Sequence, residues 1–493
     1  MKYISTRNNS KKVTFEHVFL KGLSEEGGLY IPEKLKKFDT KELKELSNLD
    51  YKSLACKIIK LFTGDFIGEK NLKHLIDMSY SNFREDNIVK INRFNQNYLL
   101  ELYHGPTLAF KDIAMQLIGN FYEYYLQKNN KKINIIVATS GDTGAAAIDA
   151  IRGKKNINIF VLHPHNKISS VQRKLMTTTR DTNVYNLAIK GKKNINIFVL
   201  HPHNKISSVQ RKLMTTNEDN NVFNLAINGN FDDCQNLVKL MFSDIDFADS
   251  INMSGVNSIN WARIIAQTVY YFYSYFQIGK KNMSFSVPTG NFGDVYAGYI
   301  AKQMGLPIGK LIVATNQNDI LHRAISNGDY KSNKVQETLS PSMDIQVASN
   351  FERLLYDLYG KNSEMLTNVM KSIKKNSFKI EKDVLARLRE DFDSESLKET
   401  EIIKIIKNFY EKNKIIIDPH TAIGVGAVEK LNLTNAVILA TAHPCKFPVA
   451  IEKAISKSEK LPESLNYIYD KEEKFQVISN DLEKVKDFVR KCV

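Results

Sequence analysis

Short apolar runs, each bounded by Gly, Pro, Asn or His, alternate with helical patterns between about residue 95 and residue 320. The runs are INIIVAT, INIFVLH, VFNLAI, MSFSVPT and LIVATNQ. Short apolar runs of this kind are typical of buried strands, and strands that alternate with helices form parallel sheets. The pattern therefore predicts an α/β fold built on mostly parallel, doubly wound sheets.

The flanking segments have a different pattern. Residues 1 to about 80 contain Lys-rich amphipathic stretches that predict helices, and residues 350 to 415 predict strongly charged helices. A further helix is expected to begin at Asp418-Pro419, with a strand after it in AVILATAHP. The tail after about residue 460 predicts a small peripheral element. We divide the chain into an N-terminal helical region (1–94), a central region (95–450) and a C-terminal peripheral segment (451–493).

An internal repeat interrupts the central region. The units 153–190 and 191–228 match at 33 of 38 positions, and their first 26 residues are identical. Each unit predicts a β-α-β pattern, but only the second continues into another helical pattern. Parallel strands need a crossover, usually a helix, so we expect the fold to loop out one copy. The high identity indicates a recent tandem duplication or an error in the recorded sequence.

Composition and charge exclude several classes of protein. The chain has 493 residues, 43% of them hydrophobic, and a formal net charge of +15. Of the 69 cationic residues 56 are Lys and 13 are Arg, so no Arg-rich surface for nucleic acid is indicated. One repeat unit carries +6 of this charge, and a chain without that unit would have 455 residues and a charge of +9.

Cysteine spacing and hydropathy narrow the setting. The four cysteines form no CxxC pair, and no apolar stretch is long enough for a membrane span or a signal peptide. We therefore expect a soluble cytoplasmic protein, a monomer or homodimer, with no metal site and no nucleic-acid or membrane partner.

Two polar segments follow predicted strands early in the central region, where open α/β sheets bind ligands. Lys111, in ELYHGPTLAFKDIAMQ, follows an apolar triplet and precedes a helix. A desolvated lysine at such a place can form a Schiff base, although a surface lysine beside Asp112 would have the same pattern. Ser140 and Thr143, in VATSGDTGAAA, either bind a carboxylate or phosphate or only cap the helix.

Two more segments follow later strands. The loop Gly290–Asp294, with the sequence GNFGD, opens a helix and its amides predict an anion site that matches neither a dinucleotide nor a Walker motif. Thr441, His443 and Lys446 follow the last strand in LATAHPCKFP. We assign no metal or thiol chemistry to His443, to Cys445 or to the two HPH triplets, because no ligand set surrounds them in the sequence.

Together these segments resemble the threonine synthase family, which comprises pyridoxal-phosphate (PLP) enzymes of the tryptophan-synthase-β type, fold type II. The resemblance covers nearly the whole chain outside one repeat unit. It is carried by YISTRN, FLKGLSEEGGLYIPE, HGPTLAFKD, ATSGDTGAAA, FVLHPHNKISSVQRKLMTT, NGNFDDCQ, NSINWARIIAQTVYYF, VPTGNFGD, SPSMDIQVASNFERLLYDLYG, DPHTAIG and TAHPCKFP.

The resemblance implies a reaction. A PLP-dependent lyase of this family converts O-phospho-L-homoserine and water to L-threonine and phosphate, the last step of threonine biosynthesis. It implies a large and a small lobe within residues 95–450, which become the PLP-binding catalytic region. Lys111 would hold PLP as an internal aldimine and then move protons during γ-elimination of phosphate and β-addition of water.

The resemblance also implies roles for the other segments. Gly290, Asn291, Phe292, Gly293 and Asp294 would bind the PLP phosphate, and Thr441 would face the pyridine nitrogen. For the substrate it points to Ser140, Thr143, Asn260, Arg263 and Lys446, the last two at the substrate phosphate.

Two other interpretations remain open, and a third is disfavoured. The chain could be a related PLP-dependent phospholyase or dehydratase, or a threonine synthase paralogue impaired by the duplication. A non-catalytic basic binding protein would need Arg-rich, aromatic-interleaved stripes, and the sequence has none.

Overall fold

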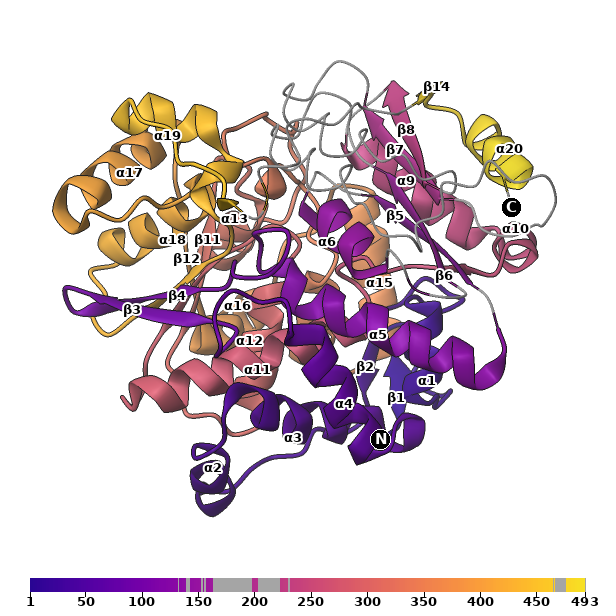
Figure 1. Ribbon diagram of the computed structural model, residues 1–493, viewed down its shortest axis with the longest axis horizontal. Helices are drawn as coiled ribbons and strands as arrows, with labels where there is room; N and C mark the ends of the chain where they lie inside the picture. Colours follow the sequence, from indigo (N-terminus) through magenta and orange to yellow (C-terminus); the bar gives the residue numbers. More distant parts are fainter. Residues whose placement is uncertain are drawn as a thin grey trace. The chain divides into compact units, whose positions relative to one another are not determined.

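The computed structural model describes residues 1–131, 133–138, 142–151, 154, 157–162, 197–202, 222–228, 231–463, 465 and 476–492. The chain forms two compact units, and most of their elements are labelled in Figure 1. Unit 1 comprises Met1–His104, Ser258–Pro444 and Val449–Ser458, and unit 2 comprises Gly105–Asn257, Cys445–Pro448 and Glu459–Val493.

Unit 1 is built on a six-stranded sheet with the order β12-β11-β10-β13-β4-β3. All neighbouring strands are parallel except the antiparallel pair β3 and β4. Along the chain the strands are β3 (Lys90–Phe94), β4 (Asn97–Glu101), β10 (Phe285–Pro288), β11 (Leu311–Thr315), β12 (Phe392–Ser396) and β13 (Val437–Ala440). The central strands β11 and β13 are buried at every position, as strands covered on both faces should be.

Helix α18 (Pro419–Lys430) shows how the sequence brings a helix onto this sheet. Asp418 caps its first turn and accepts from the His420 amide at 2.9 Å, with Pro419 at the first position. The helix packs on β10, β11 and β13. A Cβ at Gly424 would lie 3.0 Å from Cγ2 of Ile438, so the glycine permits the close approach.

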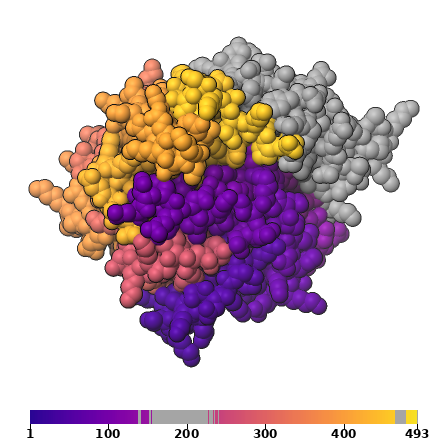
Figure 2. Space-filling view, turned by 60° about the vertical axis from the view of Figure 1, so that its left-hand side comes forward, coloured from indigo at the N-terminus to yellow at the C-terminus, as the bar shows by residue number. Residues whose placement is uncertain are grey.

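The N-terminal residues pack on helix α11 (Trp261–Ile278). They form the antiparallel pair β1 (Tyr3–Ser5) and β2 (Tyr30–Pro32) and the helices α1 (Phe15–Lys21), α2 (Thr40–Leu46), α3 (Tyr51–Thr63) and α4 (Glu69–Tyr80). The fully buried Trp261 lies among the rings of Tyr3, Phe62 and Tyr296. Figure 2 shows the indigo N-terminal residues beside the rose-coloured part of the chain that contains α11.

The remaining helices of unit 1 lie between or after its strands. They are α12 (Gly293–Gln303), α13 (Ile320–Asn327), α14 (Phe351–Leu358), α15 (Ser363–Lys374), α16 (Lys382–Asp391), α17 (Glu399–Asn413) and most of α19 (Pro448–Ile455). Helix α12 contacts β10 and β11, and α13 contacts β11 and β12.

Unit 2 contains two three-stranded parallel sheets, β6-β5-β9 and β14-β8-β7. Their strands are β5 (Ile133–Ala138), β6 (Ile157–Leu162), β7 (Ile197–Pro202), β8 (Val222–Asn228), β9 (Met253–Ser254) and β14 (Gln476–Ser479). The helices are α5 (Lys111–Asn129), α6 (Asp142–Ile151), α9 (Phe231–Ser243), α10 (Ile245–Ser250) and α20 (Leu482–Cys492). A core around Ile136, Met241 and Val485 joins β5, α9 and α20.

Both repeat units contribute strands to these sheets. The first copy supplies β6, which pairs with β5, and the second copy supplies β7 and β8, which pair with each other. The expectation that one copy is looped out is therefore wrong for its first strand. The helix and second strand expected in the first copy lie outside the described residues.

The sequence pattern predicts most elements correctly. The α/β class, the mostly parallel sheets and the strands expected from INIIVAT, INIFVLH, VFNLAI, MSFSVPT and LIVATNQ are confirmed. Strand β12 corrects the expectation of helix throughout 350–415. Its sequence FDSES is polar, because β12 is an edge strand with one unpaired side. The tail after residue 460 supplies β14 to a sheet rather than only a peripheral element.

Candidate active site

Lys111 is the first residue of α5, in unit 2. The turn before it contains Leu108 at a φ of 61°, and the Lys111 ammonium lies 5.1 Å from the centroid of the Phe110 ring. The side chain is 11% exposed, and Nζ lies 3.4 Å from Oδ2 of Asp142. The lysine expected from the sequence is thus buried beside a carboxylate.

Asp142 contacts two ammonium groups. It begins α6, where a carboxylate is stabilised by the helix dipole. Its Oδ1 lies 2.6 Å from Nζ of Lys446, whose side chain is fully buried. Lys446 Nζ also donates to the Thr107 carbonyl at 2.8 Å. This buried group therefore has two cations and one anion.

Asp112 fixes the turn that precedes Lys111. Its carboxylate accepts from the amide of Thr107 at 2.8 Å and from Oγ1 at 2.5 Å. Burial raises the pKa of Asp112 to about 6. A Cβ at Gly105 would lie 2.4 Å from Cβ of Asp112, so only glycine fits there.

Ser140 and Thr143 are the two other substrate-binding residues expected near the start of the second segment, VATSGDTGAAA, and the structure describes only Thr143. Thr143 is the second residue of α6 and is partly buried. Ser140 lies outside the described residues.

The loop Gly290–Asp294 joins β10 to α12 in unit 1. Phe292 has a φ of 63° and precedes the first residue of the helix, so the chain turns sharply there. A Cβ at Gly290 would lie 3.0 Å from the Ser342 carbonyl oxygen, and one at Gly293 would lie 3.3 Å from Nδ2 of Asn350. These close approaches hold the loop against Ser342 and Asn350, in front of the first turn of α12, whose N–H groups suit an anion.

Neighbouring side chains hold this loop in place. Asn350 donates from its amide and from Nδ2 to the Asn291 carbonyl, both at 3.1 Å. The Asp294 carboxylate accepts from the hydroxyls of Tyr270 and Tyr271 on α11. Burial and the Asp294 charge keep the pKa of both tyrosines well above the usual value.

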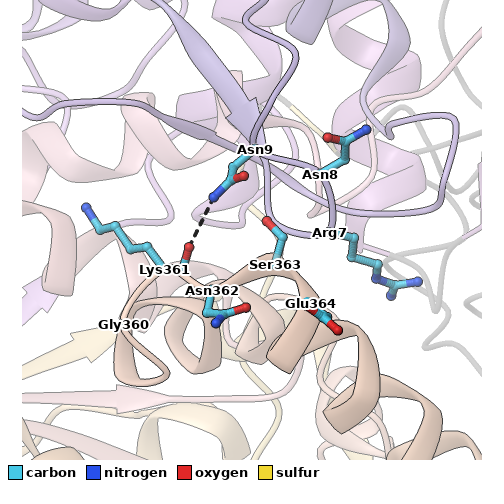
Figure 3. A pocket seen from close by; sticks show the side chains of 8 residues that line it. All are labelled: Arg7, Asn8, Asn9, Gly360, Lys361, Asn362, Ser363 and Glu364. Carbon is cyan, nitrogen blue, oxygen red and sulfur yellow. Dashed lines mark hydrogen bonds between the residues drawn. The ribbon is translucent and has the colours of Figure 1, made fainter.

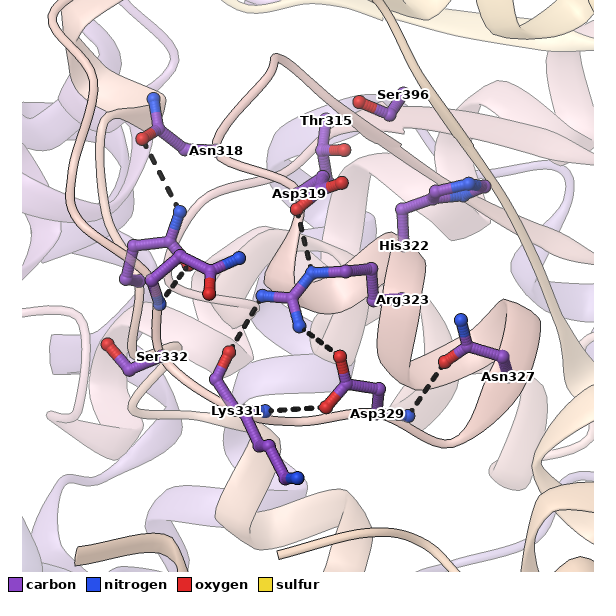
Figure 4. Close-up of polar contacts among 12 residues, drawn as sticks. Thr315, Asn318, Asp319, His322, Arg323, Asn327, Asp329, Lys331, Ser332 and Ser396 are labelled. Atoms are coloured by element: carbon purple, nitrogen blue, oxygen red, sulfur yellow. Dashed lines mark hydrogen bonds and ion pairs between the residues drawn. The ribbon is translucent and has the colours of Figure 1, made fainter. Parts of the chain in front are cut away.

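A polar cluster around Asp344 fixes the segment that contains Ser342, whose carbonyl oxygen Gly290 approaches. The Asp344 carboxylate accepts from Thr338 N and from Asn316 Nδ2, each at 2.8 Å, and burial raises its pKa to about 6. Figure 4 shows the outer part, where Arg323 lies between Asp319 at 2.9 Å and Asp329 at 2.5 Å.

Thr441 follows β13 and is 6% exposed. Because β13 runs parallel to β10, the carboxyl ends of the two strands lie on the same side of the sheet. Thr441 and the loop Gly290–Asp294 follow these two ends. Two residues further on, burial and the charge of Arg84 lower the pKa of His443 to about 4, so its imidazole is neutral at pH 7.

Asn260 and Arg263 lie at the start of α11. Asn260 is fully buried, caps the helix by accepting from Ala262 N at 3.0 Å and donates to the Phe19 carbonyl at 3.0 Å. Arg263 is buried, and desolvation lowers its pKa to about 10, which leaves the guanidinium charged at neutral pH.

Comparison with known proteins decides the family. The model for the threonine synthase N terminus matches residues 2–80, that for pyridoxal-phosphate dependent enzymes matches 86–441, and that for the threonine synthase C-terminal region matches 421–489. The chain is 41% identical to threonine synthase of Pseudomonas aeruginosa, with 99% of this chain and 98% of the relative covered. The chain belongs to the threonine synthase family. Its cofactor is PLP, and the predicted fold type is confirmed.

Other threonine synthases agree along the whole length. That of Saccharomyces cerevisiae is 39% identical over 99% of this chain and 97% of its own. The PLP-bound structure from Brucella melitensis matches with a TM-score of 0.87 and 39% identity, covering 100% of this chain and 99% of that one. The yeast structure matches with a TM-score of 0.84 and 38% identity, covering 100% and 98%.

The residues present fit the cofactor of a threonine synthase. The loop Gly290–Asp294 leads into the first turn of α12, whose main-chain N–H groups fit a phosphate. Lys111 provides a buried amine. Among the described residues no cluster of metal-ligating side chains was found, and no described helix is long and apolar enough to cross a membrane.

The sequence did not predict several residues that hold the segments of the candidate site in place. Asp112 was expected to have only a capping role and no role was predicted for Thr107, although a Thr five residues before an Asp was a visible signal. The contacts of Asn350 with Asn291 and of Tyr270 with Asp294 join segments far apart in the chain, so no local pattern could have found them.

One pocket of unit 1 contains none of these candidate residues. It has a volume of about 580 Å³ and is lined by Arg7, Asn8, Asn9, Gly360, Lys361, Asn362, Ser363 and Glu364 (Figure 3). Asn9 Nδ2 donates across it to the Lys361 carbonyl at 3.2 Å, while Arg7 pairs with Glu352 at 2.7 Å. Because Arg7 and Asn9 are already engaged in these internal contacts, we assign the pocket no ligand.

Proposed function

We propose that this chain converts O-phospho-L-homoserine and water to L-threonine and phosphate, with PLP bound to Lys111. The observation that carries the proposal is the buried Lys111 amine at the start of α5, 3.4 Å from the Asp142 carboxylate. Similarity to threonine synthases over 99% of the chain supports this reaction over other PLP chemistry.

The chain offers groups for both ends of the cofactor. Gly290 to Asp294 would bind its phosphate through main-chain N–H groups, and Thr441 would face its pyridine nitrogen. A Thr hydroxyl carries no charge, so it leaves that nitrogen unprotonated where a carboxylate would favour the protonated form. When bound, PLP withdraws electrons from the α-carbon of the substrate and so makes the α- and β-protons and the γ-phosphate removable.

Lys111 is the proton-transfer group in this proposal. Its amine would take a proton from the α-carbon and then one from the β-carbon, and phosphate would leave from the γ-carbon. The amine would return one proton to the γ-carbon and one to the α-carbon, while water gives its hydroxyl to the β-carbon and its remaining proton to the phosphate. Asp142 stabilises the ammonium form after each transfer, because an opposite charge nearby favours the charged state. The 3.4 Å contact is long for a hydrogen bond, so Asp142 holds this amine only weakly.

In this proposal Ser140 and Thr143 would bind the substrate carboxylate. Arg263 would bind the substrate phosphate, with Asn260 fixing the first turn of α11 in front of it. For Lys446, the contacts with Asp142 and Thr107 favour a positioning role instead.

We also propose that the enzyme works in the cytoplasm as a monomer or homodimer, without nucleic acid or membrane. The buried thiols of Cys56 and Cys445 agree with a reducing compartment. Light scattering after gel filtration should give the mass of one or two chains, and a larger assembly would count against this part.

Product analysis tests the proposal. The purified chain with PLP should release threonine and inorganic phosphate in equal amounts from O-phospho-L-homoserine, and little ammonia from threonine or serine. Lys111→Ala should remove turnover and the visible absorption of bound cofactor. Lys128→Ala, on the exposed face of the same helix, should keep both. Ammonia without threonine would point to a dehydratase, and cofactor binding without turnover to an impaired paralogue.

A further inference from the structure

We propose that Lys446 is a positioning residue, which fixes Asp142 and the turn before Lys111 and thereby places the Lys111 amine. This inference rests on the proposed function and deepens it, because it removes Lys446 from the substrate-phosphate site. All the residues concerned belong to unit 2.

The two contacts of Asp142 differ in length. Lys446 lies 2.6 Å from Oδ1, and Lys111 lies 3.4 Å from Oδ2. The shorter distance is that of a strong charge-assisted hydrogen bond, and the longer one is near the limit for any hydrogen bond. Of the two lysines, Lys446 therefore holds Asp142 more tightly.

Burial makes the closer pair rigid. The Lys446 side chain is 0% exposed and that of Asp142 is 3% exposed. A buried ammonium that lost its carboxylate would be an uncompensated charge, which is strongly destabilising. Moving Lys446 away from Asp142 toward a substrate phosphate would therefore carry a large cost in free energy.

The second contact of Lys446 reaches the turn itself. Its Nζ donates to the Thr107 carbonyl at 2.8 Å, while the Thr107 amide and hydroxyl donate to Asp112. Thr107 is thus fixed from two sides, four residues before Lys111. Lys446 connects three separate segments: this turn, the start of α6 and its own short stretch Cys445–Pro448.

Three variants separate a positioning role from a phosphate-binding one: Lys446→Met, Asp142→Asn and the double variant. Lys446→Arg keeps the charge and should partly rescue. Lys486→Met is a matched control outside the site, since Lys486 also pairs with a carboxylate at 2.6 Å and is 6% exposed. The double variant removes both charges together, so it remains testable if Lys446→Met alone does not fold.

The first readout does not need turnover. Each variant without cofactor is mixed with pyridoxal, which lacks the phosphate, and cyanoborohydride, and labelling of the Lys111 peptide is followed by mass spectrometry. We expect labelling roughly 10- to 100-fold slower in Lys446→Met than in wild type, the size of effect that a misplaced reacting group produces. In the Asp142→Asn background, Lys446→Met should add little, because contacting residues are not additive.

The second readout is steady-state kinetics, which determine kcat and KM separately. With O-phospho-L-homoserine, Lys446→Met should lower kcat and leave KM nearly unchanged. A raised KM in both backgrounds, with labelling at the wild-type rate, would overturn the inference and return Lys446 to the substrate phosphate. Absence of threonine from the wild-type chain would instead contradict the proposed function, whatever the labelling rates.

Discussion

Asp112 accepts two hydrogen bonds from Thr107, at 2.8 Å from the amide and 2.5 Å from the hydroxyl, and both residues are buried. This pair lies immediately beside Lys111, so the reactive lysine begins its helix from a fixed turn. The same Thr107 accepts from Lys446 through its carbonyl. Asp112 and Lys446 therefore act on one residue from different segments.

Asp112 should make stability depend on pH. Its pKa is about 6 in the folded chain against 3.8 as the ordinary value, so the folded state binds the proton more tightly. A carboxyl with a raised folded pKa lowers stability as pH rises from about 4 to about 6. The free energy of unfolding of wild type should fall by roughly 3 kcal/mol relative to Asp112→Asn across this interval. Urea unfolding of both proteins at several pH values measures it, and parallel curves would refute the role of Asp112.

Gly105→Ala should disturb the same turn. The new Cβ would lie 2.4 Å from Cβ of Asp112, a distance that requires the backbone to move. We expect a loss of about 1–3 kcal/mol in stability and slower labelling of Lys111. Gly68→Ala is the control, since no atom lies within 4 Å of its Cβ. Equal effects of the two substitutions would show that the turn is not tightly packed.

Gly290→Ala should weaken cofactor binding. Its Cβ would approach the Ser342 carbonyl to 3.0 Å, and the loop would have to move away from the segment fixed by Asp344. A cost of about 1.4 kcal/mol raises the dissociation constant of PLP tenfold, and we expect at least that. Equilibrium titration by absorbance measures the constant. Unchanged affinity would place the cofactor phosphate elsewhere.

Thr441→Asp should change the electronic state of the bound cofactor. A carboxylate facing the pyridine nitrogen would favour its protonation, whereas Thr441→Ser keeps a neutral hydroxyl. We expect a shifted visible spectrum and lower kcat for Thr441→Asp, and near wild-type behaviour for Thr441→Ser. Identical spectra for the three proteins would remove Thr441 from the cofactor.

Deletion of residues 153–190 should preserve or raise activity. The strand sequence of the first copy is repeated in the second, so one strand would pair with β5 on one side and β8 on the other, as β6 and β7 do separately. The charge would fall to +9 in a chain of 455 residues. Circular dichroism and turnover of the shortened chain test this, and loss of both would show that the repeat is integral to the fold.

Local patterns predict the elements but not every partner. The strands that were expected have apolar runs, and the capping pair Asp418-Pro419 marks α18 correctly, because caps and burial act within a few residues. Strand β12 was not predicted because an edge strand can be polar. Strand β14 was not predicted because it pairs with β8, which lies far away along the chain. The expectation that one repeat copy is looped out was wrong for its first strand, because two identical strands can each pair with a different neighbour.

The candidate site divides in the same way. Lys111, the loop Gly290–Asp294 and Thr441 were visible because each follows a strand and precedes a helix or chain turn. The partnership of Asp142 with Lys446 was not, since 304 residues separate them in the sequence and only folding joins them. It also changes how Lys446 is interpreted, from a ligand of phosphate to a support for Lys111.

The identity of the reactive lysine is the most direct test of PLP attachment at Lys111. The chain is loaded with PLP, reduced with borohydride and digested, and the modified peptide is sequenced by mass spectrometry. We predict one pyridoxyl group per chain, on Lys111 alone among the 56 lysines. A label on any other lysine, or no label on a folded chain, would contradict it.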